Sequence, residues 1–199
     1  MIVIGLTGSI GMGKTETARM FAEQGVPVSD SDAIVHRLYE QGGAAVAPVA
    51  DAFAGVVTDG RIDRQKLARH LAAHPDDFAR LEKIVHPLVR AEQNRFIATV
   101  RKQKAPLAVL DIPLLFETGR DRDVDKIVVV SAPADVQRRR VLARPGMTEE
   151  KFASILARQV PDSEKRARAD FVVDSHHGFD HARRQVAAII AALSKSDSA

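Results

Sequence analysis

The sequence predicts an α/β fold in which a mostly parallel five-stranded sheet is flanked by helices. Short apolar runs alternate with stretches of helical periodicity along the chain. The runs are apolar throughout, as expected for parallel strands that are buried on both faces. A long helical stretch, residues 44–104, separates the second run from the third. Alternating strands and helices place ligands at the carboxyl ends of the strands.

The composition is that of one globular domain. The 199 residues are 45% hydrophobic and 28% charged, enough for a single well-buried core. Disulfides, thiol nucleophiles and Cys-ligated zinc are excluded because the chain has no cysteine. No apolar run is long enough to cross a membrane, and the first one is too short for a signal peptide. We therefore expect a cytoplasmic enzyme with no membrane partner.

The charge balance is slightly basic, with a net charge of +3 and a pI near 9.4. Aromatic residues make up only 5%, and there is one tyrosine and no tryptophan, so stacking platforms for bases are few. A small polyanionic ligand explains the excess of positive charge as well as a nucleic acid does. We expect no nucleic-acid partner and no obligate protein partner.

The first apolar run, residues 2–6, leads into a loop with the spacing Gly-x-x-x-x-Gly-Lys-Thr at positions 8–15. This spacing between a strand and a helix predicts a phosphate-binding loop, rather than a turn that merely joins the two. We expect its glycines to take positive φ, so that backbone N–H groups and the positive end of the helix converge on a polyphosphate. The expected nucleotide-binding residues of the loop are Gly8, Gly11, Met12, Gly13, Lys14, Thr15 and Glu16.

Within the loop, the Lys14 side chain is expected to bridge the β- and γ-phosphates, and the Thr15 hydroxyl is suited to Mg²⁺. The loop does not say which acceptor receives the γ-phosphate. Water, a protein and a small molecule all remain open at this point.

The second run, residues 26–29, ends in Asp30-Ser31-Asp32, before a helix expected to start at Ala33 and to stop at Gly42-Gly43. Asp32 has two interpretations. It can orient an acceptor hydroxyl and take its proton late in phosphoryl transfer. Alternatively, it caps the helix and has no catalytic role.

Three helices are expected within residues 44–104. They cover residues 45–53, then 64–73 with Asp63 as the cap, then 76–100 with a break or kink at His86-Pro87. His86 is interpreted from its context as a packing or kink residue. His70 and His74 have the spacing of metal ligands, but no Glu follows His70, as a hydrolytic zinc helix requires.

The third and fourth runs, residues 107–110 and 126–130, are followed by further candidates. Asp111 ends the third run, as in a Walker-B strand, and would hold Mg²⁺ directly or through water unless it is an ordinary loop residue. In the helix expected over 134–143, one face carries basic and amide side chains that can clamp a transferring phosphoryl group. They are Gln137, Arg140 and Arg144, whereas Arg138 and Arg139 point elsewhere.

A solvated face remains the alternative for Arg140. The rest of the chain predicts a helix capped by Thr148, a last strand over 170–173, a loop at His176-His177 and a helix over 178–193. The expectation for residues 194–199 is a frayed tail.

Five segments, taken together, resemble the dephospho-coenzyme A kinase family. They are Gly5 to Thr15, Asp30 to His36, Ile84 to Val89, Asp111 to Glu117, and the Gln137 to Arg144 stretch. The resemblance runs in order from residue 1 to about residue 175. It implies a P-loop NTPase fold and transfer of the ATP γ-phosphate to the ribose 3′-hydroxyl of dephospho-coenzyme A, the last step of coenzyme A synthesis.

The resemblance also implies an organisation in three parts. The nucleotide-binding core comprises about 1–30, 105–136 and 168–199, the helical acceptor-binding subdomain about 31–104, and the lid about 137–167.

Site roles follow from the same resemblance. Lys14 stabilises the phosphates, Asp32 is the base, and Arg140 belongs to the lid that contacts ATP. The acceptor pocket is lined by His86, Pro87, Leu114, Leu115, Phe116 and Glu117.

The sequence departs from the family pattern at Ser31, where Ala is frequent, at Glu16, where Thr is common, and at Ser175, where Asn commonly follows Asp near the adenine. A kinase acting on another small molecule, such as a nucleoside monophosphate, is the alternative within enzymes. A GTPase switch is disfavoured because no Asn-Lys-x-Asp motif occurs.

Overall fold

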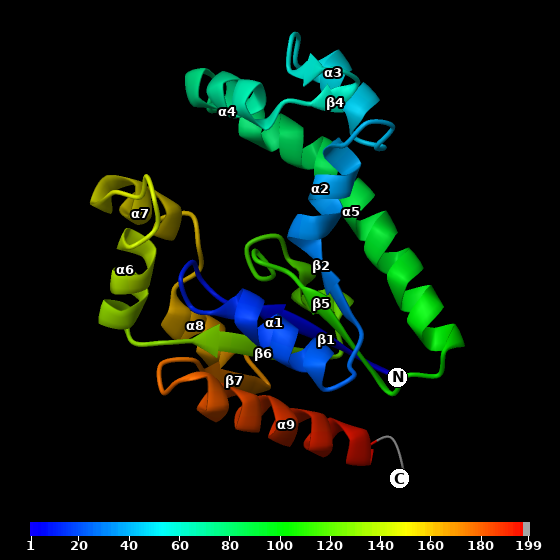
Figure 1. Ribbon diagram of the computed structural model, residues 1–199, viewed down its shortest axis with the longest axis vertical. Coiled ribbons are helices and arrows are strands. Elements are labelled where there is room, and N and C mark those ends of the chain that lie inside the picture. The colour runs from blue at the N-terminus through cyan, green and yellow to red at the C-terminus, as the bar shows by residue number, and fades with distance from the viewer. Residues whose placement is uncertain (197–199) are drawn as a thin grey trace. The chain divides into compact units, whose positions relative to one another are not determined.

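The computed structural model describes residues 1–196 and forms two compact units, which are described separately. The core unit comprises Met1–Ser29 and the chain from Val100 onward, and the insertion unit comprises Asp30–Thr99. Figure 1 labels the elements. The strands of the core unit are β1 (Ile2–Thr7), β2 (Val28–Asp30), β5 (Leu107–Asp111), β6 (Lys126–Ser131) and β7 (Phe171–Asp174). Its helices are α1 (Lys14–Glu23), η1 (Arg120–Asp123), α6 (Ala134–Leu142), α7 (Glu149–Leu156), α8 (Asp162–Ala167) and α9 (Phe179–Ser196).

The sheet of the core unit has the strand order β2-β5-β1-β6-β7. The pairs β1–β5, β1–β6 and β6–β7 are parallel. Strand β1 is central, and Ile4 and Leu6 on it are fully buried, as expected for a strand covered on both faces. The predicted mostly parallel five-stranded sheet is therefore confirmed.

Helices α1 and α9 pack against each other and against the sheet. Phe21 of α1 and Val186 of α9 are fully buried in the core cluster, which also contains Val109 and Val128 of the sheet. Burial of such side chains contributes about 1.5–3 kcal/mol each. The core thus fixes the start of α1, and with it the loop after β1, on the sheet.

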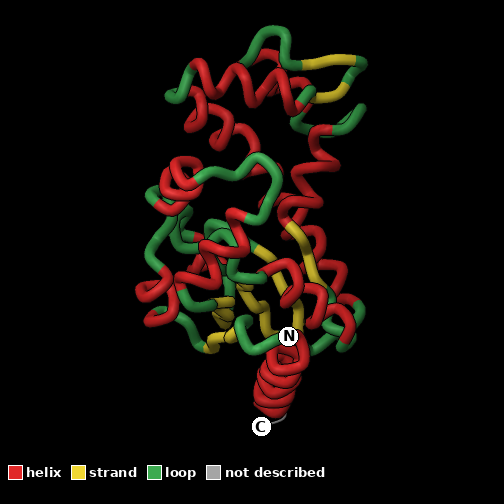
Figure 2. Tube along the Cα trace, turned by 60° about the vertical axis from the view of Figure 1, so that its left-hand side comes forward, coloured by secondary structure: helices red, strands yellow, loops and turns green. Residues whose placement is uncertain are grey.

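The insertion unit has a hydrophobic cluster of its own, in which Phe53, Leu67 and Val85 are buried. Its elements are α2 (Ser31–Tyr39), α3 (Val46–Ala52), β3 (Val57–Thr58), β4 (Arg61–Ile62), α4 (Arg64–Ala73) and α5 (Asp77–Lys102), the last of which continues into the core unit. Strands β3 and β4 form an antiparallel hairpin, seen as two short yellow segments in Figure 2.

Most elements agree with the sequence predictions. Helix α4 has the predicted bounds, and Asp63 Oδ1 caps it by accepting hydrogen bonds from the N–H groups of Gln65 and Lys66, each at 3.0 Å. The cap of α7 is also as predicted, because the Thr148 hydroxyl accepts a hydrogen bond from the Lys151 N–H. The hairpin β3–β4, the helix α8 and the short helix η1 were not predicted.

Several expected boundaries are wrong. Helix α2 ends at Tyr39 instead of Gly42-Gly43, because Gly43 N–H already closes a turn onto Glu40 O at 2.8 Å. The helix is not broken at Pro87, because α5 is one helix whose buried Val85 and Val89 on either side of the proline anchor it in the insertion cluster. The alternative, a kink at His86-Pro87, stays a prediction.

At the C-terminal end, α9 extends to Ser196, beyond the predicted end at Leu193. The expected frayed tail is therefore wrong for residues 194–196, and its remainder, residues 197–199, lies outside the described residues. Across residues 1–196, no helix is both long and apolar enough to cross a bilayer.

Candidate active site

The loop between β1 and α1 has the backbone that a phosphate-binding loop requires. Gly11 and Gly13 have φ of 79° and 95°, in the left-handed region that favours glycine. Gly8 does not have positive φ, so that part of the prediction is wrong. Glycine is required there for space, since a Cβ at Gly8 would lie 2.6 Å from the carbonyl oxygen of Val130.

The first turn of α1 leaves its backbone N–H groups available to an anion. Helix α1 begins at Lys14 with Gly13 as the N-cap residue, and within residues 1–196 no side chain caps it. The first N–H groups of a helix have no partner within the helix, and the dipole makes this end positive. An uncapped helix start that follows a glycine loop is suited to binding phosphate.

Lys14 and Asp111, predicted separately, are brought together. Leu6 and Asp111 are paired in the register of β1 and β5, so Asp111 lies beside the start of the loop. Lys14 Nζ and Asp111 Oδ1 form an ion pair, and the two side chains are 13% and 4% exposed. Thr15, the other predicted Mg²⁺ ligand, is exposed in the first turn of α1.

Helix α6 contacts the phosphate loop through the face that the sequence predicted. Gln137 Nε2 donates to the carbonyl oxygen of Ile10 at 2.7 Å, and Arg140 Nη1 lies 3.5 Å from the carbonyl oxygen of Gly11. Arg138 and Arg139 are exposed, and Arg138 pairs with Glu149 of α7. A solvated face is therefore the wrong interpretation for Arg140.

Arg144, the third member of the predicted face, is exposed one turn further along the chain. The part of the chain that the structure describes gives its side chain no hydrogen bond or ion pair to the loop, and its contact with ATP stays a prediction.

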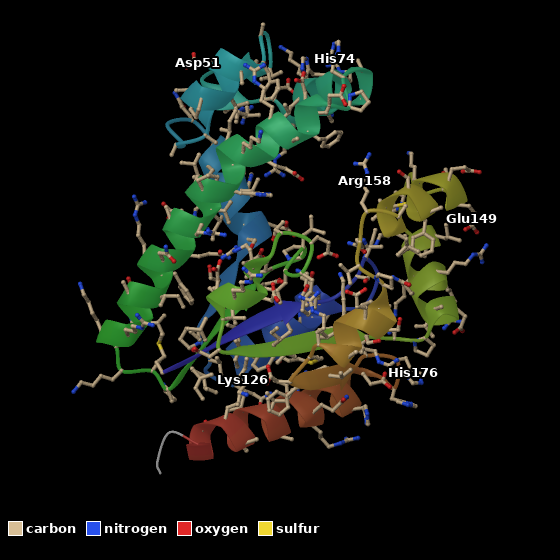
Figure 3. All side chains as sticks on the ribbon, turned by 180° about the vertical axis from the view of Figure 1, so that it is seen from behind. Asp51, His74, Lys126, Glu149, Arg158 and His176 are labelled. Atoms are coloured by element: carbon tan, nitrogen blue, oxygen red, sulfur yellow. The ribbon has the colours of Figure 1, made fainter. Side chains whose placement is uncertain are left out.

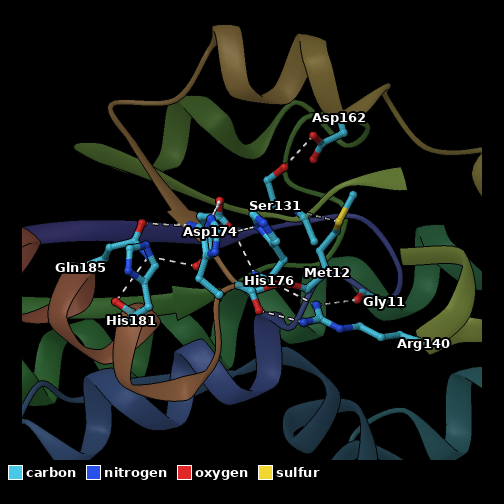
Figure 4. A network of polar contacts seen from close by, with 12 residues as sticks. Gly11, Met12, Ser131, Arg140, Asp162, Asp174, His176, His181 and Gln185 are labelled. Atoms are coloured by element: carbon cyan, nitrogen blue, oxygen red, sulfur yellow. Dashed lines mark hydrogen bonds and ion pairs between the residues drawn. The ribbon is translucent and has the colours of Figure 1, made fainter. Parts of the chain in front are cut away.

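Ser175, which follows β7, joins Arg140 to the loop between β1 and α1. Its hydroxyl donates to the carbonyl oxygen of Met12 at 2.6 Å, while Arg140 donates to the Ser175 hydroxyl and carbonyl oxygens at 2.8 Å each (Figure 4). From the sequence, Ser175 was considered only as a contact to the adenine ring, and this connection was missed. A hydroxyl next to the final strand gives no sign of such a role in the sequence.

The neighbouring Asp174 has a carboxyl group whose pKa is changed by its surroundings. Partial burial disfavours its ionised form, but hydrogen bonds from the amide and ring of His176 outweigh it and lower the pKa of Asp174. The backbone of Asp174 is also fixed, because its N–H donates to Gln185 Oε1 at 3.0 Å and its carbonyl oxygen accepts from Gln185 Nε2 at 2.9 Å.

A second set of contacts holds the segment between α7 and α8. Gln159 Oε1 accepts from Ile10 N–H at 3.1 Å, and Glu117 Oε1 accepts from Val160 N–H at 2.9 Å. Lys165 Nζ, on a side chain that is 0% exposed, lies 2.8 Å from the same Glu117 oxygen. Sequence reasoning missed Lys165, because a lysine in a polar helical stretch is normally solvated.

The segment after β5 contributes packing as well as possible substrate contacts. Leu115 is fully buried, its Cδ1 close to Gly5, and Phe116 is buried with the Arg168 guanidinium 4.2 Å from its ring centroid. Leu114 and Glu117 are half-buried. Of the four residues expected to line an acceptor pocket from this segment, Leu114 and Glu117 are therefore the accessible ones, and Glu117 is already paired with Lys165.

In the insertion unit, the acidic pair that follows β2 has divided roles. Asp30, rather than Asp32, caps α2, with Oδ1 accepting from the N–H groups of Asp32 and Ala33 at 2.8 Å and 3.1 Å. The helix begins at Ser31, one residue before Asp32, so the capping interpretation of Asp32 is wrong. Asp32 is exposed in the first turn, with its carboxylate not used as a cap.

Ser31, between the two acids, is held by a residue that sequence reasoning missed. Gln93 of α5 is 1% exposed, and its Nε2 donates to the Ser31 hydroxyl at 3.0 Å. The signal was present, because Gln93 continues the buried positions Val85 and Val89 at intervals of four residues. A polar residue on an apolar helix face indicates a buried hydrogen bond.

His86 and Pro87 are both exposed on α5, outside the face that carries the buried Val85 and Val89. Their predicted contacts with an acceptor are compatible with that exposure. The candidate acceptor residues thus belong to both units, with Asp32, His86 and Pro87 in the insertion unit and residues 114–117 in the core unit.

Comparison with known proteins agrees with this geometry. The profile of the dephospho-CoA kinase family matches residues 2–180. A dephospho-CoA kinase of Agrobacterium fabrum is 60% identical over 194 residues, covering 97% of this chain and 98% of the relative. One of Brucella melitensis is 55% identical over 199 residues, covering 100% of this chain and 98% of the relative.

Solved structures show the same fold. A Thermus thermophilus crystal structure superposes with a TM-score of 0.80 at 35% identity, covering 96% of this chain and 97% of that one. A dephospho-CoA kinase from Campylobacter jejuni gives a TM-score of 0.68 at 21% identity, covering 97% of both chains.

Proposed function

The chain belongs to the dephospho-coenzyme A kinase family, and we propose that it transfers the γ-phosphate of ATP to the ribose 3′-hydroxyl of dephospho-coenzyme A. The products are coenzyme A and ADP, so the reaction is the last step of coenzyme A synthesis. The observation that carries the proposal is the uncapped start of α1, which follows the glycine loop and has Lys14 and Asp111 together beside it.

For the donor, the proposal assigns the triphosphate of ATP to the N–H groups of residues 8–16 and to the Lys14 ammonium. Fixed N–H dipoles and a cation stabilise the charge that develops on the transferring group. Arg140 and Arg144 of the lid are the further cationic contacts to ATP. The contacts of Arg140 with the loop support its assignment. The assignment of Arg144 is supported by its position about one helical turn after Arg140.

For the acceptor, Asp32 is the proposed base. The 3′-oxygen attacks the γ-phosphorus, the bond from that phosphorus to the β–γ bridging oxygen breaks, and the hydroxyl proton passes late to the Asp32 carboxylate. The finding that Asp30 caps α2 supports this role, because it leaves the Asp32 carboxylate free of the cap. The remaining acceptor contacts are assigned to His86, Pro87 and residues 114–117.

The proposal includes Mg²⁺, for which the Thr15 hydroxyl and the Asp111 carboxylate are the candidate ligands. Both offer hard oxygen atoms, which Mg²⁺ prefers. When bound, the ion neutralises charge on the β- and γ-phosphate oxygens. The Lys14 ammonium, which pairs with Asp111, has the reach to meet the phosphates on the same side of the loop.

We place the enzyme in the cytoplasm and expect it to need neither nucleic acid nor a membrane nor an obligate protein partner. The low aromatic content of 5% supports the absence of a nucleic-acid partner, because it leaves few stacking platforms.

An acceptor panel tests the proposed function. ADP release is measured with ATP and Mg²⁺, in the presence of dephospho-coenzyme A, AMP, CMP, shikimate or no acceptor. We expect strong stimulation by dephospho-coenzyme A alone and a product with one additional phosphate by mass spectrometry. Stimulation by a nucleoside monophosphate instead would identify another small-molecule kinase, and nucleotide binding without stimulation by any acceptor would point to a switch protein.

A further inference from the structure

A cluster of imidazole and carboxylate groups, to which the proposed kinase reaction assigns no role, flanks Ser175 immediately after β7. Asp174 ends the strand, and His176 and His177 form the turn before α9. Ligand atoms from these three residues lie within 4.8 Å of one another. Figure 3 shows His176 beyond the end of the sheet opposite to Lys126, which starts β6, so the cluster lies at the carboxyl ends of the strands.

The ligand atoms of the cluster are close enough to converge on a single ion after small side-chain rotations. His176 Nδ1 is hydrogen-bonded to Asp174 Oδ1 at 2.6 Å, and His177 Nε2 lies 3.8 Å from Asp174 Oδ2. A tetrahedral ion with bonds of about 2.0–2.1 Å has ligand atoms about 3.3 Å apart, so an ion would replace this hydrogen bond and draw His177 closer to the carboxylate. The two imidazole rings are also adjacent, with centroids 3.6 Å apart.

The surroundings hold the carboxylate and supply a third imidazole. Gln185 fixes the backbone of Asp174 on both sides, through the two hydrogen bonds given above (Figure 4). The His181 ring lies one turn into α9, with its centroid 5.1 Å from that of His177. The side chains of His176 and His177 are 29% and 57% exposed, so an ion can reach them from solvent.

We propose that Asp174, His176 and His177 form a binding site for one divalent transition-metal ion of the Zn²⁺ class. Two imidazoles with one carboxylate are a donor set that suits Zn²⁺, Ni²⁺ or Cu²⁺, whereas Mg²⁺ prefers oxygen ligands only. This site is therefore chemically distinct from the proposed Mg²⁺ ligands of the kinase reaction.

The position of the site indicates what a bound ion does. Ser175 lies between two of the ligands in the chain, and its hydroxyl and carbonyl groups hold Met12 and Arg140. An ion on Asp174, His176 and His177 fixes the turn that carries Ser175. Occupancy thus stiffens the backbone that connects the lid arginine with the phosphate loop.

Calorimetric titration of the tag-free chain with ZnCl₂, in the absence of nucleotide, tests the proposal. We expect one ion per chain, with affinity at least about tenfold weaker in His176→Gln and in His177→Gln, because each loses a ligand. Both side chains are exposed, so the variants retain the fold, which circular dichroism checks. Unchanged zinc affinity in either variant would overturn the proposal.

The second histidine pair of the chain gives the matched control. His70 and His74 also lie close, with ring centroids 4.8 Å apart, and His70 Nε2 is 2.6 Å from Asp77 Oδ2. We expect His74→Gln to leave zinc affinity unchanged. A loss of zinc affinity in His74→Gln, with none in His176→Gln or His177→Gln, would assign the ion to the histidines of α4 and its C-terminal end and refute the site after β7.

Hydrogen exchange adds a readout that is independent of affinity. Zinc should slow exchange in peptides covering residues 172–182 of the wild-type chain, and have no such effect in His176→Gln. Slowing of the same extent in both would contradict coordination by the turn.

Discussion

The phosphate loop and the acidic segment after β2 both supply predicted catalytic groups, but the fold holds them very differently. The loop is contacted by α6, by the segment between α7 and α8 and by Ser175, and Lys14 is largely buried. Asp32 is exposed, and its side chain is not part of the cap that fixes α2. Under the proposed function, the donor site is built before ligands bind, whereas the Asp32 carboxylate is expected to gain its partners from the acceptor.

This difference predicts which properties each substitution changes. Groups in the densely contacted region should affect binding or stability along with rate. Exposed groups of the acceptor side should affect rate alone.

The largest effect is expected for Asp32→Asn. Loss of the base should lower kcat by about 10²–10⁴-fold, while the affinity for ATP and the melting temperature stay at wild-type values. Steady-state kinetics, calorimetry with an ATP analogue and thermal melting measure the three quantities.

Asp30→Asn is the matched control for that variant. Asn caps helices about as well as Asp, so this change should leave kcat close to wild type. If Asp32→Asn keeps its turnover and Asp30→Asn loses it, the base is Asp30. If both keep turnover, Asp111 becomes the candidate.

The next effect in size is that of Lys14→Ala. Removing the cation should lower kcat/KM by about 10²–10³-fold, as for other groups that stabilise transition-state charge. In contrast to Asp32→Asn, it should also weaken ATP binding, because the ammonium contacts the ground-state phosphates. Lys126→Ala, at the far end of the sheet, is the control, and unchanged ATP affinity in Lys14→Ala would count against the loop as the donor site.

A third test concerns the buried ion pair below the loop. Lys165→Met should lower the free energy of unfolding by about 3 kcal/mol, because it leaves the Glu117 carboxylate buried without its counter-charge. In the described chain the second Glu117 oxygen has no hydrogen-bond partner, so little else compensates that charge. Denaturant unfolding measures the loss.

The double variant Glu117→Gln with Lys165→Met separates charge from packing. It removes both charges and keeps an oxygen for the Val160 N–H, so it should recover most of the lost stability. A double variant as unstable as Lys165→Met would mean that the methylene packing of Lys165, and not its charge, stabilises the segment.

The sequence was sufficient for the donor side because backbone geometry there follows from local pattern. A strand, a glycine loop and a helix in succession already determine where N–H groups converge, and β-strand pairing then brings Asp111 to Lys14. The identity of the acceptor depended on the family resemblance, since no local pattern specifies dephospho-coenzyme A.

Contacts between distant segments could not be predicted in the same way. Lys165 and Glu117 are 48 positions apart, and neither has a sequence context that distinguishes a buried pair from two solvated charges. Helix α2 was expected to start at Ala33 but starts at Ser31, because start positions two residues apart are equally compatible with the pattern. Gln93 was the detectable exception, since a polar residue interrupts the buried face of α5.

The smallest effect is expected at the amino end of the sheet, far along the strands from the phosphate loop. Asp170 Oδ1 accepts a hydrogen bond from Lys126 Nζ and Asp170 Oδ2 accepts one from Ile127 N–H, both at 2.8 Å. Partial burial opposes ionisation of Asp170, but these contacts outweigh it and lower its pKa. A carboxyl group whose pKa is lower in the folded state stabilises the fold above its unfolded pKa of about 3.9, and this contribution is lost as the pH falls through the folded value.

Asp170→Asn should therefore lower the melting temperature at pH 7 by only about 2 °C, because the pair with Lys126 is partly exposed and screened by solvent. The difference from wild type should shrink as the pH falls below about 4, where the wild-type carboxyl also becomes protonated. Asp180→Asn, which alters a more exposed pair with Arg183, should change nothing at either pH. The catalytic rate should stay at the wild-type value in both variants. A loss of turnover in Asp170→Asn would contradict the view that the residues stabilising this end of the sheet are separate from those that bind the nucleotide.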